Sequence, residues 1–142
     1  MTTTQGRYII DDDATRHDWD RVHLWLTTAY WCAGISRELV ERAAVGSSLV
    51  VGAYLDGVEV GYLRVVSDCA TFAWVCDVFI DEKHRGVGLA TAMLRFAMSH
   101  PTHQNLRRWV LATRDAHRVY ETCGFAPLPF PERWMMYKPG QS

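Results

Sequence analysis

The sequence contains no run of about eighteen consecutive apolar residues, the length that a membrane-spanning helix needs. Its first residues also lack a basic segment followed by an apolar one, so no secretory signal is predicted and we expect the protein in the cytoplasm. An excess of either charge is missing as well, since 15 Lys and Arg stand against 16 Asp and Glu. Strong electrostatic attraction to nucleic acid or to an anionic membrane is therefore excluded, and we expect neither as a partner.

Cysteine is scarce and follows no metal-binding pattern. The chain has four cysteines, and no two of them form a C-x-x-C pair. Because two of them stand in apolar surroundings, reduced core thiols are favoured over a zinc site or a disulfide framework. The histidines add no ligand pattern, since His100 and His103 flank a proline that interrupts a helix face. No metal site is expected. The four cysteines are Cys32, Cys69, Cys76 and Cys123.

Aromatic residues are the one component in excess, with six Trp, six Tyr and five Phe among 142 residues. Hydrophobic residues make up 49% and charged residues 22%, as in ordinary soluble globular proteins. No repeat, low-complexity tract or flexible linker divides the chain, so we expect one domain over residues 1–142. The aromatic excess predicts a large core, an aromatic-lined pocket, or both.

The first half of the chain predicts two helices and an antiparallel strand pair. A short strand at residues 8–10 precedes a helix from residue 19 to about 32, for which the Asp11–Asp13 run offers capping carboxylates. A second helix follows the capping residue Ser36 and ends at Gly46. The β-rich runs at residues 49–55 and 58–66 meet at Asp56-Gly57, a strong hairpin signal.

The second half of the chain predicts a strand at 71–80, a glycine-containing loop, a helix at 89–98 and a strand at 108–112. A short helix over 115–122 follows, with Asp115 as its natural N-cap. The segment 125–137 is interrupted by three prolines and predicts irregular or strand structure. Together these elements predict a mixed α/β sandwich whose first half is mainly antiparallel.

The stretch Arg85-Gly86-Val87-Gly88-Leu89-Ala90 lies between a predicted strand and a predicted helix. Two glycines let the backbone approach a ligand, and free N–H groups at a helix start bind anions with support from the helix dipole. We expect this loop to bind a phosphate. It lacks the G-x-x-x-x-G-K-[ST] pattern of nucleoside triphosphate loops and the G-x-G-x-x-G pattern of dinucleotide loops.

The same stretch resembles the pyrophosphate loop [QR]-x-x-G-x-[GA] of the GNAT (Gcn5-related) N-acetyltransferases. A second GNAT motif, Asn-x-x-Ala-x-x-x-Tyr-x-x-x-Gly-Phe, is matched further along by Thr113, Ala116, Tyr120, Gly124 and Phe125, with Thr in place of the usual Asn. The order of the elements also agrees, so the resemblance covers most of the chain. It implies a GNAT-like α/β fold, in which a mixed, mainly antiparallel central sheet is flanked by helices and its central strands splay apart.

The resemblance implies acetyl-CoA as the acetyl donor. In GNAT enzymes the strand before the loop binds the pantetheine arm through its backbone, and an N–H there supports the thioester oxyanion. The N–H groups of the loop hold the pyrophosphate, while the second motif flanks the CoA arm. The Arg85 side chain is left without an assigned contact. The cofactor-binding residues implied here are Val78, Phe79, Ile80, Arg85, Gly86, Val87, Gly88, Leu89, Ala90, Thr91, Thr113 and Ala116.

Acetyl transfer to an amine needs both a base and an acid. Direct attack requires an unprotonated amine, whereas an alkylamine with a pKa of about 10.4 is charged at neutral pH. The leaving thiolate benefits from a donor, for which a phenol with a pKa of about 10 is suitable. The resemblance implies that Tyr120 lies near the sulfur, and we expect Tyr120 to be the acid. The alternative is an aromatic side chain that packs under the loop.

The base is harder to place. Many GNAT enzymes have a carboxylate pair just before the pantetheine-binding positions, but Cys76 replaces the first carboxylate here and leaves Asp77. An unpaired carboxylate in this apolar strand would have a raised pKa, which suits a base. The alternative is a structural Asp77 that accepts backbone hydrogen bonds or pairs with an arginine. The fallback candidates are His117, Asp68 and a water relay.

The acceptor pocket of GNAT enzymes is built by the first two helices, their connection and the chain after the last motif. Aromatic walls there suit an apolar or a cationic amine. We expect Trp31, Phe130 and Trp134 to contact the acceptor, whereas Trp25 and Tyr30 lie near the helix stripe and are expected in the core. No acidic cluster marks a groove for a polyamine or a histone tail, so a small-molecule amine is the expected acceptor.

The sequence thus predicts an acyltransferase that moves the acetyl group of acetyl-CoA to a small-molecule amine by direct attack in a ternary complex. Two alternatives stay open: a protein or peptide N-acetyltransferase, and a non-catalytic acyl-CoA sensor, which Cys76 at the acidic position supports. A ping-pong route through a cysteine has no base placed by a motif, and Cys123 stays open as its carrier. The oligomeric state is open between a monomer and a homodimer.

Overall fold

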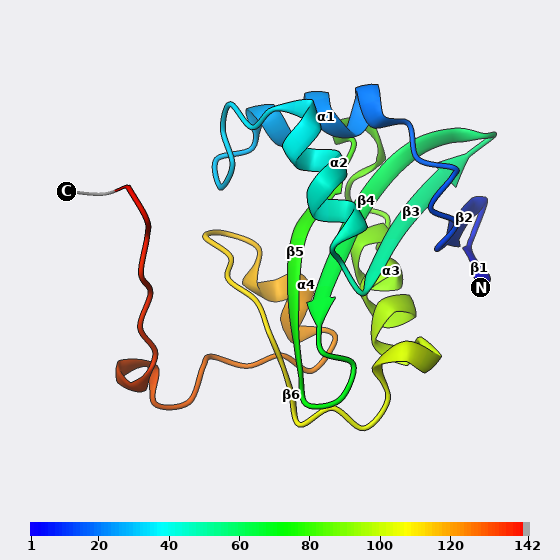
Figure 1. Ribbon diagram of the computed structural model, residues 1–142. Coiled ribbons are helices and arrows are strands. Elements are labelled where there is room, and N and C mark those ends of the chain that lie inside the picture. Colours follow the sequence, from blue (N-terminus) through cyan, green and yellow to red (C-terminus); the bar gives the residue numbers. More distant parts are fainter. Residues whose placement is uncertain (141–142) are drawn as a thin grey trace.

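The computed structural model describes residues 1–140 and shows a six-stranded sheet with helices on both faces (Figure 1). The strands lie side by side in sequence order, and every neighbouring pair is antiparallel except β5 and β6, which are parallel. The predicted mixed, mainly antiparallel α/β fold is confirmed. The strands are β1 (Thr2–Gln5), β2 (Tyr8–Asp11), β3 (Leu49–Leu55), β4 (Val58–Ser67), β5 (Phe72–Ile80) and β6 (Arg108–Val110). The α-helices are α1 (Trp19–Thr28), α2 (Arg37–Val45), α3 (Leu89–Ser99) and α4 (His117–Glu121).

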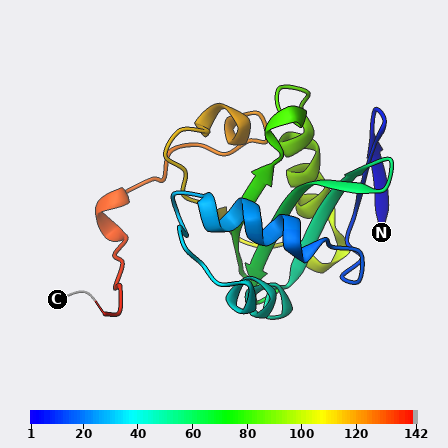
Figure 2. The ribbon, with the colours of Figure 1, turned by 90° about the horizontal axis from the view of Figure 1, so that it is seen from above.

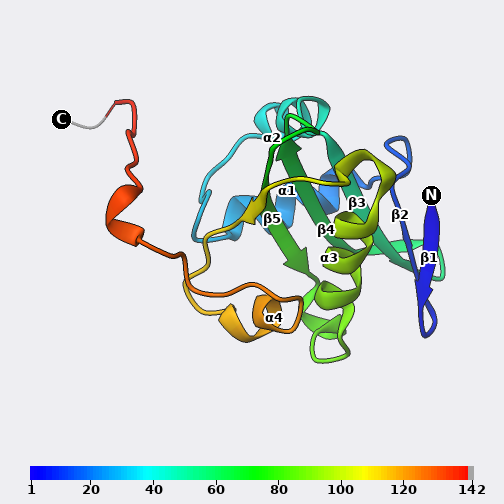
Figure 3. The same cartoon turned by 90° about the horizontal axis from the view of Figure 1, so that it is seen from below.

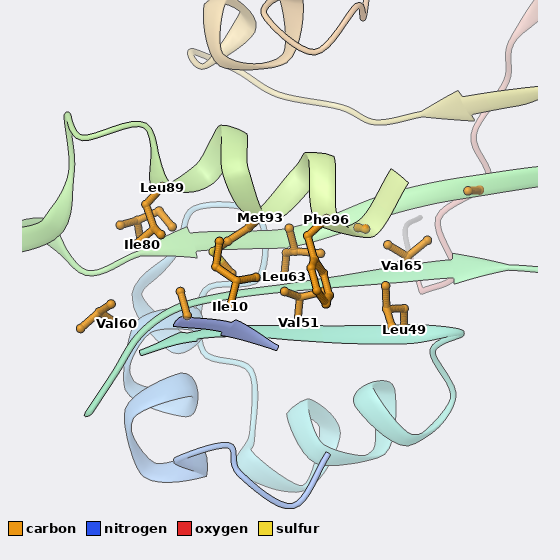
Figure 4. Close-up of a cluster of buried hydrophobic side chains, with 13 residues drawn as sticks. Ile10, Leu49, Val51, Val60, Leu63, Val65, Ile80, Leu89, Met93 and Phe96 are labelled. Carbon is orange, nitrogen blue, oxygen red and sulfur yellow. The ribbon is translucent and has the colours of Figure 1, made fainter. Parts of the chain in front are cut away.

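Two hydrophobic cores fix the helices to the sheet. Helix α3 covers one face, and α1 with α2 covers the other (Figures 2 and 3). Under α3, the side chains of Leu89, Met93 and Phe96 form one stripe that packs on sheet residues such as Leu63 (Figure 4). On the other face, α1 and α2 pack on Tyr62. Burying each large apolar side chain contributes about 1.5–3 kcal/mol, so the start of α3 is held firmly at the end of β5.

The sheet opens at β5. This strand pairs with β4 on one side, but it pairs with β6 only over residues 72–74. Strand β6 ends at that point and the chain after it leaves β5, so the β6 side of residues 75–80 has no strand partner within residues 1–140. The expected splay of the central strands is therefore confirmed.

Several elements begin and end at the signals that predicted them. The β3–β4 hairpin turns at Asp56-Gly57, and Ser36 caps α2 by accepting the N–H of Leu39 at 3.2 Å. Helix α3 begins directly after the glycine loop. Strand β1 was not predicted, and it pairs with β2 at the sheet edge.

The predicted cap of α1 is wrong. The carboxylates at positions 11 and 12 form ion pairs elsewhere, and Asp18 fills the cap by accepting the N–H of Arg21 at 3.2 Å. The helix also ends at Thr28 rather than near residue 32, because Ala29 turns to extended backbone. The following aromatic residues therefore belong to a loop and not to the helix.

The chain after α4 contains no strand up to residue 140, as the irregular alternative predicted, and forms a short 3-10 helix at Pro131–Arg133. This last segment of the chain extends away from the sheet and the helices (Figures 1 and 3). The expectation of one domain over residues 1–142 stays a prediction, and its residues 141 and 142 lie outside the described part. Between residues 1 and 140, each helix is too short or too polar to cross a membrane.

Candidate active site

A cavity of about 780 Å³ opens where β5 separates from β6. Its walls come from the second half of β5, the glycine loop with the start of α3, the chain after β6, and α4. It brings together most of the residues that the sequence predicted at the site. Only Val87 of the loop is not in its lining, and this side chain is 50% exposed. The predicted residues that line the cavity are Trp31, Asp77, Val78, Phe79, Ile80, Arg85, Gly86, Gly88, Leu89, Ala90, Thr91, Thr113, Ala116 and Tyr120.

The glycine loop presents backbone N–H groups to this cavity. Gly86 and Gly88 have φ values of 81° and 79°, in the left-handed region that favours glycine. Gly88 caps α3 without a side-chain hydrogen bond, and the first turn carries no acidic residue. The helical ladder begins with the N–H of Ala92, which donates to the Gly88 carbonyl at 3.1 Å. The N–H groups of residues 89–91 are thus free to bind an anion, and the helix dipole strengthens this site.

The open edge of β5 is a second backbone binding surface. Residues 78–80 lack a strand partner on the cavity side, so their N–H and C=O groups there can bind an extended amide-containing molecule as another strand would. One of these groups, the Ile80 carbonyl, already accepts a hydrogen bond from Nε of Arg85 at 2.9 Å. Its guanidinium also lies 5.2 Å from the centre of the Phe79 ring. The Arg85 side chain therefore closes the loop onto the strand.

Tyr120 lines the cavity from α4. Its ring makes an edge contact with Phe125, with 6.2 Å between the ring centres. Burial, followed by the nearby Tyr30 hydroxyl and Cys123 thiol, raises the pKa of Tyr120 to about 12. The phenol therefore keeps its proton across the neutral and moderately alkaline range. The Tyr120 side chain thus packs against Phe125 and also lines the cavity.

Asp77 stands at a β-bulge, where β5 has one extra residue against β4 and its φ is 56°. The bulge turns its carboxylate to two donors. Oδ2 accepts from Nε of Arg64 at 2.6 Å, and Oδ1 accepts from Nε1 of Trp31 at 2.9 Å. The side chain is 10% exposed. These contacts match the structural alternative, a carboxylate paired with an arginine, and the role of Asp77 as a base stays a prediction.

Arg64 and Tyr30 were not predicted at the site. The positive charge of Arg64 on β4, the strand next to Asp77, could have indicated this ion pair. The bulge in β5 shifts the register between the two strands, however, so the sequence alone does not place Arg64 opposite Asp77. Tyr30 was expected in the core, and this is wrong because α1 ends at Thr28 and leaves Tyr30 45% exposed. Its hydroxyl accepts the N–H of Arg114 at 2.9 Å, and the Arg114 guanidinium lies 3.9 Å from the ring centre. The prediction for Trp25 is confirmed, since this residue of α1 is buried in the core with Tyr62.

The turn that leads into α4 is stabilised by the side chain of Thr113 and not by that of Asp115. The Thr113 hydroxyl accepts the N–H of Ala116 at 3.1 Å, whereas the Asp115 carboxylate is paired with Arg114 at 3.5 Å. The predicted Asp115 cap is therefore wrong. Thr113 also lines the cavity, so a hydrogen-bonding side chain is kept where GNAT sequences often have Asn.

The fallback groups are poorly placed for chemistry. His117 does not line the cavity, and the Asp68 carboxylate binds the hydroxyl and N–H of Thr71, which lowers the pKa of Asp68. Burial raises the pKa of Cys76 to about 11 and also raises the pKa of Cys123. A raised pKa disfavours the reactive thiolate, so neither cysteine suits an acyl carrier.

Phe130 and Trp134 lie elsewhere. They line a separate cleft of about 870 Å³, together with Trp109 and Phe125. Neither lines the cavity that contains Tyr120. The structure thus does not bring them to Trp31, because the chain turns away from β5 after the second motif.

The sequence matches the family described as acetyltransferase (GNAT) over residues 10–125. A structure of a protein from Xanthomonas campestris that is assigned to this family is 41% identical, with 94% of each chain covered and a TM-score of 0.87. A comparison with curated proteins gives no match.

Two more distant structures share the fold. Glucosamine-6-phosphate N-acetyltransferase from Arabidopsis thaliana is 17% identical, with 94% of this chain and 99% of that chain covered and a TM-score of 0.64. A protein from Clostridium acetobutylicum, described as a predicted acetyltransferase with acetyl-CoA, is 15% identical, with 97% and 96% covered and a TM-score of 0.67. The family match over residues 10–125 and the 41% identity together show that this chain belongs to the acetyltransferase (GNAT) family.

Proposed function

We propose that the protein transfers the acetyl group of acetyl-CoA to the primary amine of a small molecule, by direct attack within a ternary complex. One observation carries this proposal. A single cavity of about 780 Å³ joins the free N–H groups at the start of α3, the open edge of β5 and the Tyr120 side chain. An anion site, an amide-binding edge and a proton donor in one cavity match the chemistry of a phosphorylated, amide-containing thioester.

Acetyl-CoA fits the residues that line this cavity. The N–H groups from Gly86 to Thr91 would hold its pyrophosphate, and the backbone of Val78–Ile80 would bind the amides of its pantetheine arm. Thr113 and Ala116 would flank that arm from the opposite wall. When bound, acetyl-CoA supplies an acetyl group activated as a thioester. The Clostridium acetobutylicum neighbour, which is described with acetyl-CoA, supports this choice of donor.

Tyr120 is the proposed acid, and the free N–H groups of β5 are the proposed oxyanion donors. The phenol is protonated at neutral pH because burial raises its pKa to about 12, and it donates a hydrogen bond to the leaving sulfur. A backbone N–H on the cavity side of Val78–Ile80 stabilises negative charge on the acetyl oxygen. The Tyr120 hydroxyl and the backbone N–H are neutral hydrogen-bond donors, so neither has to change its own charge to stabilise the transition state.

Asp77 is the proposed base, because it is an acidic residue that lines the cavity on the bulged part of β5. Both of its oxygens already accept hydrogen bonds, from Arg64 and from Trp31. Each oxygen keeps a further lone pair, so Asp77 can take a proton from the amine without losing these contacts, and a water relay to Asp77 is the alternative route. In either case Asp77 also holds the Trp31 indole at the edge of the cavity.

The proposed acceptor is a small amine that binds beside Trp31 and Tyr30. These rings are in edge contact, with 5.1 Å between their centres, and both line the cavity. Aromatic faces there suit an apolar or cationic amine. The Arabidopsis thaliana neighbour is named for an amino sugar phosphate, a small-molecule acceptor, which supports this class over a peptide.

The test is a thiol-release assay with acetyl-CoA and a panel of amines, in which mass spectrometry identifies the acetylated product. We expect release of CoA with an equal amount of N-acetylated small amine. Release of CoA with peptides alone would show that the acceptor is a peptide and not a small amine. Saturable binding of acetyl-CoA without release of CoA for any amine or peptide would favour a sensor. We propose the cytoplasm as the compartment, because all four cysteines have free thiols.

A further inference from the structure

A positively charged side chain, Arg114, stands at the end of the cavity that is proposed to bind the acceptor. It lies on the chain between β6 and α4, and it lines the cavity together with Tyr30 and Trp31 from the connection between α1 and α2. These two segments lie side by side and apart from the glycine loop (Figures 1 and 2). The charge of Arg114 is therefore placed beside the aromatic residues of the acceptor end and not at the phosphate-binding loop.

Tyr30 holds Arg114 through two contacts. The Tyr30 hydroxyl accepts the backbone N–H of Arg114 at 2.9 Å, and the guanidinium lies over the Tyr30 ring, 3.9 Å from the ring centre. Contact with an aromatic face orients a planar guanidinium, and its N–H donors point outward in the plane of the group. Arg114 thus presents an oriented cation at the edge of the cavity.

Most donors of this guanidinium are available to a ligand. Its ion pair within residues 1–140 is with Asp115, where Nη2 lies 3.5 Å from Oδ2 and the two side chains are 65% and 66% exposed. An ion pair at this distance between exposed side chains contributes little free energy. Because a guanidinium carries five N–H donors, this one contact leaves Arg114 able to bind a second anion.

The candidate base and the guanidinium stand at opposite ends of a short aromatic wall. Asp77 accepts the N–H of the Trp31 indole at 2.9 Å, and the Trp31 ring is 5.1 Å from the Tyr30 ring between centres. Arg114 covers the face of Tyr30. An acceptor that lies along this wall with its amine near Asp77 presents its other end to Arg114, and a few carbon atoms are enough for that span.

We propose that the acceptor amine carries an anionic group, a carboxylate or a phosphate, and that Arg114 binds this group. The inference rests on the proposed acetyl transfer and names the class of its acceptor. The transfer itself is unchanged: the amine nitrogen bonds to the acetyl carbon, the carbon–sulfur bond breaks, and the proton lost by nitrogen balances the proton gained by sulfur. Carboxylates and phosphates are the anions that a guanidinium binds through two parallel hydrogen bonds.

The same arrangement disfavours an acceptor with a second positive charge. Aromatic rings alone suit a cation, but the guanidinium of Arg114 already occupies one face of Tyr30. A diamine bound along the wall would bring its second ammonium group close to this guanidinium, and like charges at short range repel each other. Among amines of similar length, a diamine should therefore be the poorest acceptor.

The first test compares four primary amines in the thiol-release assay: γ-aminobutyrate, aminoethyl phosphate, butylamine and putrescine. We expect kcat/KM for at least one of the two anionic amines to exceed that of butylamine about 10-fold to 100-fold, because hydrogen bonds to a charged group contribute about this factor. Putrescine should have the lowest kcat/KM. The first two amines also distinguish a carboxylate from a phosphate as the preferred anion.

Substitutions of Arg114 test whether this side chain causes the preference. Arg114→Gln should remove the preference, and Arg114→Glu should reverse it in favour of putrescine, because the repulsive charge changes sign. Arg118→Gln is the matched control and should keep the wild-type preference, because Arg118 is an exposed residue of α4 that does not line the cavity.

Calorimetry gives a measurement without turnover. With saturating CoA in place of acetyl-CoA, the Kd of the preferred anionic amine should rise about 10-fold in Arg114→Gln. The Kd of CoA alone should stay at the wild-type value in this variant. A rise in the Kd of CoA alone would assign the guanidinium to the cofactor and overturn the inference.

The outcomes separate this inference from the proposed function. Equal kcat/KM for anionic and neutral amines, or an anion preference that survives Arg114→Gln, would overturn the inference and leave acetyl transfer to a small amine in place. Release of CoA with no amine of any class would contradict the proposed function, and the inference would fall with it.

Discussion

Replacing Tyr120 by Phe isolates the contribution of one hydroxyl to catalysis. The ring and its edge contact with Phe125 are kept, so folding should change little. The lost group is a phenol whose pKa burial raises to about 12, which makes it a protonated donor at every pH below about 11. Binding of acetyl-CoA, which depends on backbone groups, should be nearly unchanged.

The expected loss in kcat follows from this pKa. General acids contribute about 100-fold to 10,000-fold, which is roughly 2.7–5.5 kcal/mol of transition-state stabilisation. A thiolate whose conjugate acid has a pKa of about 8.5 is a weaker base than a tyrosinate with a pKa of about 12, so complete proton transfer to sulfur is unfavourable. Tyr120 should therefore act mainly as a hydrogen-bond donor. We expect a fall in kcat at the lower end of the range, about 100-fold.

The assay is thiol release at saturating amine, with kcat and the KM for acetyl-CoA measured separately. Tyr54→Phe is the matched control, because the buried Tyr54 hydroxyl has no hydrogen-bond partner within residues 1–140 and does not line the cavity. We expect wild-type kcat in that control. A Tyr120→Phe enzyme with kcat within about twofold of the wild type would refute the role of Tyr120 as donor, because about twofold is well below any general-acid effect.

Three further predictions concern the base, the anion site and the pH dependence of stability. Asp77→Asn should lower kcat about 100-fold or more and remove the acidic limb of the rate profile, because a base is active only when deprotonated, and an unchanged profile would assign the base elsewhere. Gly88→Ala should raise the Kd of acetyl-CoA about 5-fold to 30-fold in calorimetry with little change in kcat. A φ of 79° costs a non-glycine residue about 1–2 kcal/mol, so the free loop of the variant relaxes and binding has to restore the left-handed conformation. Equal affinity would argue against this loop as the phosphate site. Burial lowers the pKa of His103 below its ordinary 6.5, so protonation favours the unfolded chain, and its contribution to stability should be complete above about pH 6.5 and decline as pH falls below it. Thermal unfolding should show this slope in the wild type and a flatter one in His103→Gln, whereas equal slopes would exclude His103 as its source.

Local signals were enough to predict much of the fold. Ser36 caps α2 and Asp56-Gly57 turns the hairpin, because a cap or a two-residue turn depends on neighbouring residues alone. The same holds for Gly86 and Gly88, whose positive φ values and place before α3 follow from the local sequence. The backbone part of the candidate site could therefore be predicted.

Contacts between distant segments could not be predicted in this way. The pair of Arg64 and Asp77 depends on the register of two strands, and the bulge shifts that register by one residue. Tyr30 was assigned to the core by helical spacing, which no longer applies once α1 has ended at Thr28. The segment after α4 is interrupted by three prolines and follows no periodic pattern, so its course could not be predicted from the sequence.

The central claim is that one cavity holds acetyl-CoA with its reactive sulfur beside Tyr120. A crystal structure of the protein with bound CoA tests this claim most directly. We expect the pyrophosphate at the N–H groups of residues 86–91, the pantetheine arm along residues 78–80 of β5, and the sulfur facing the Tyr120 hydroxyl. CoA bound instead in the cleft beside Phe130 and Trp134, or a sulfur that points away from Tyr120, would contradict it.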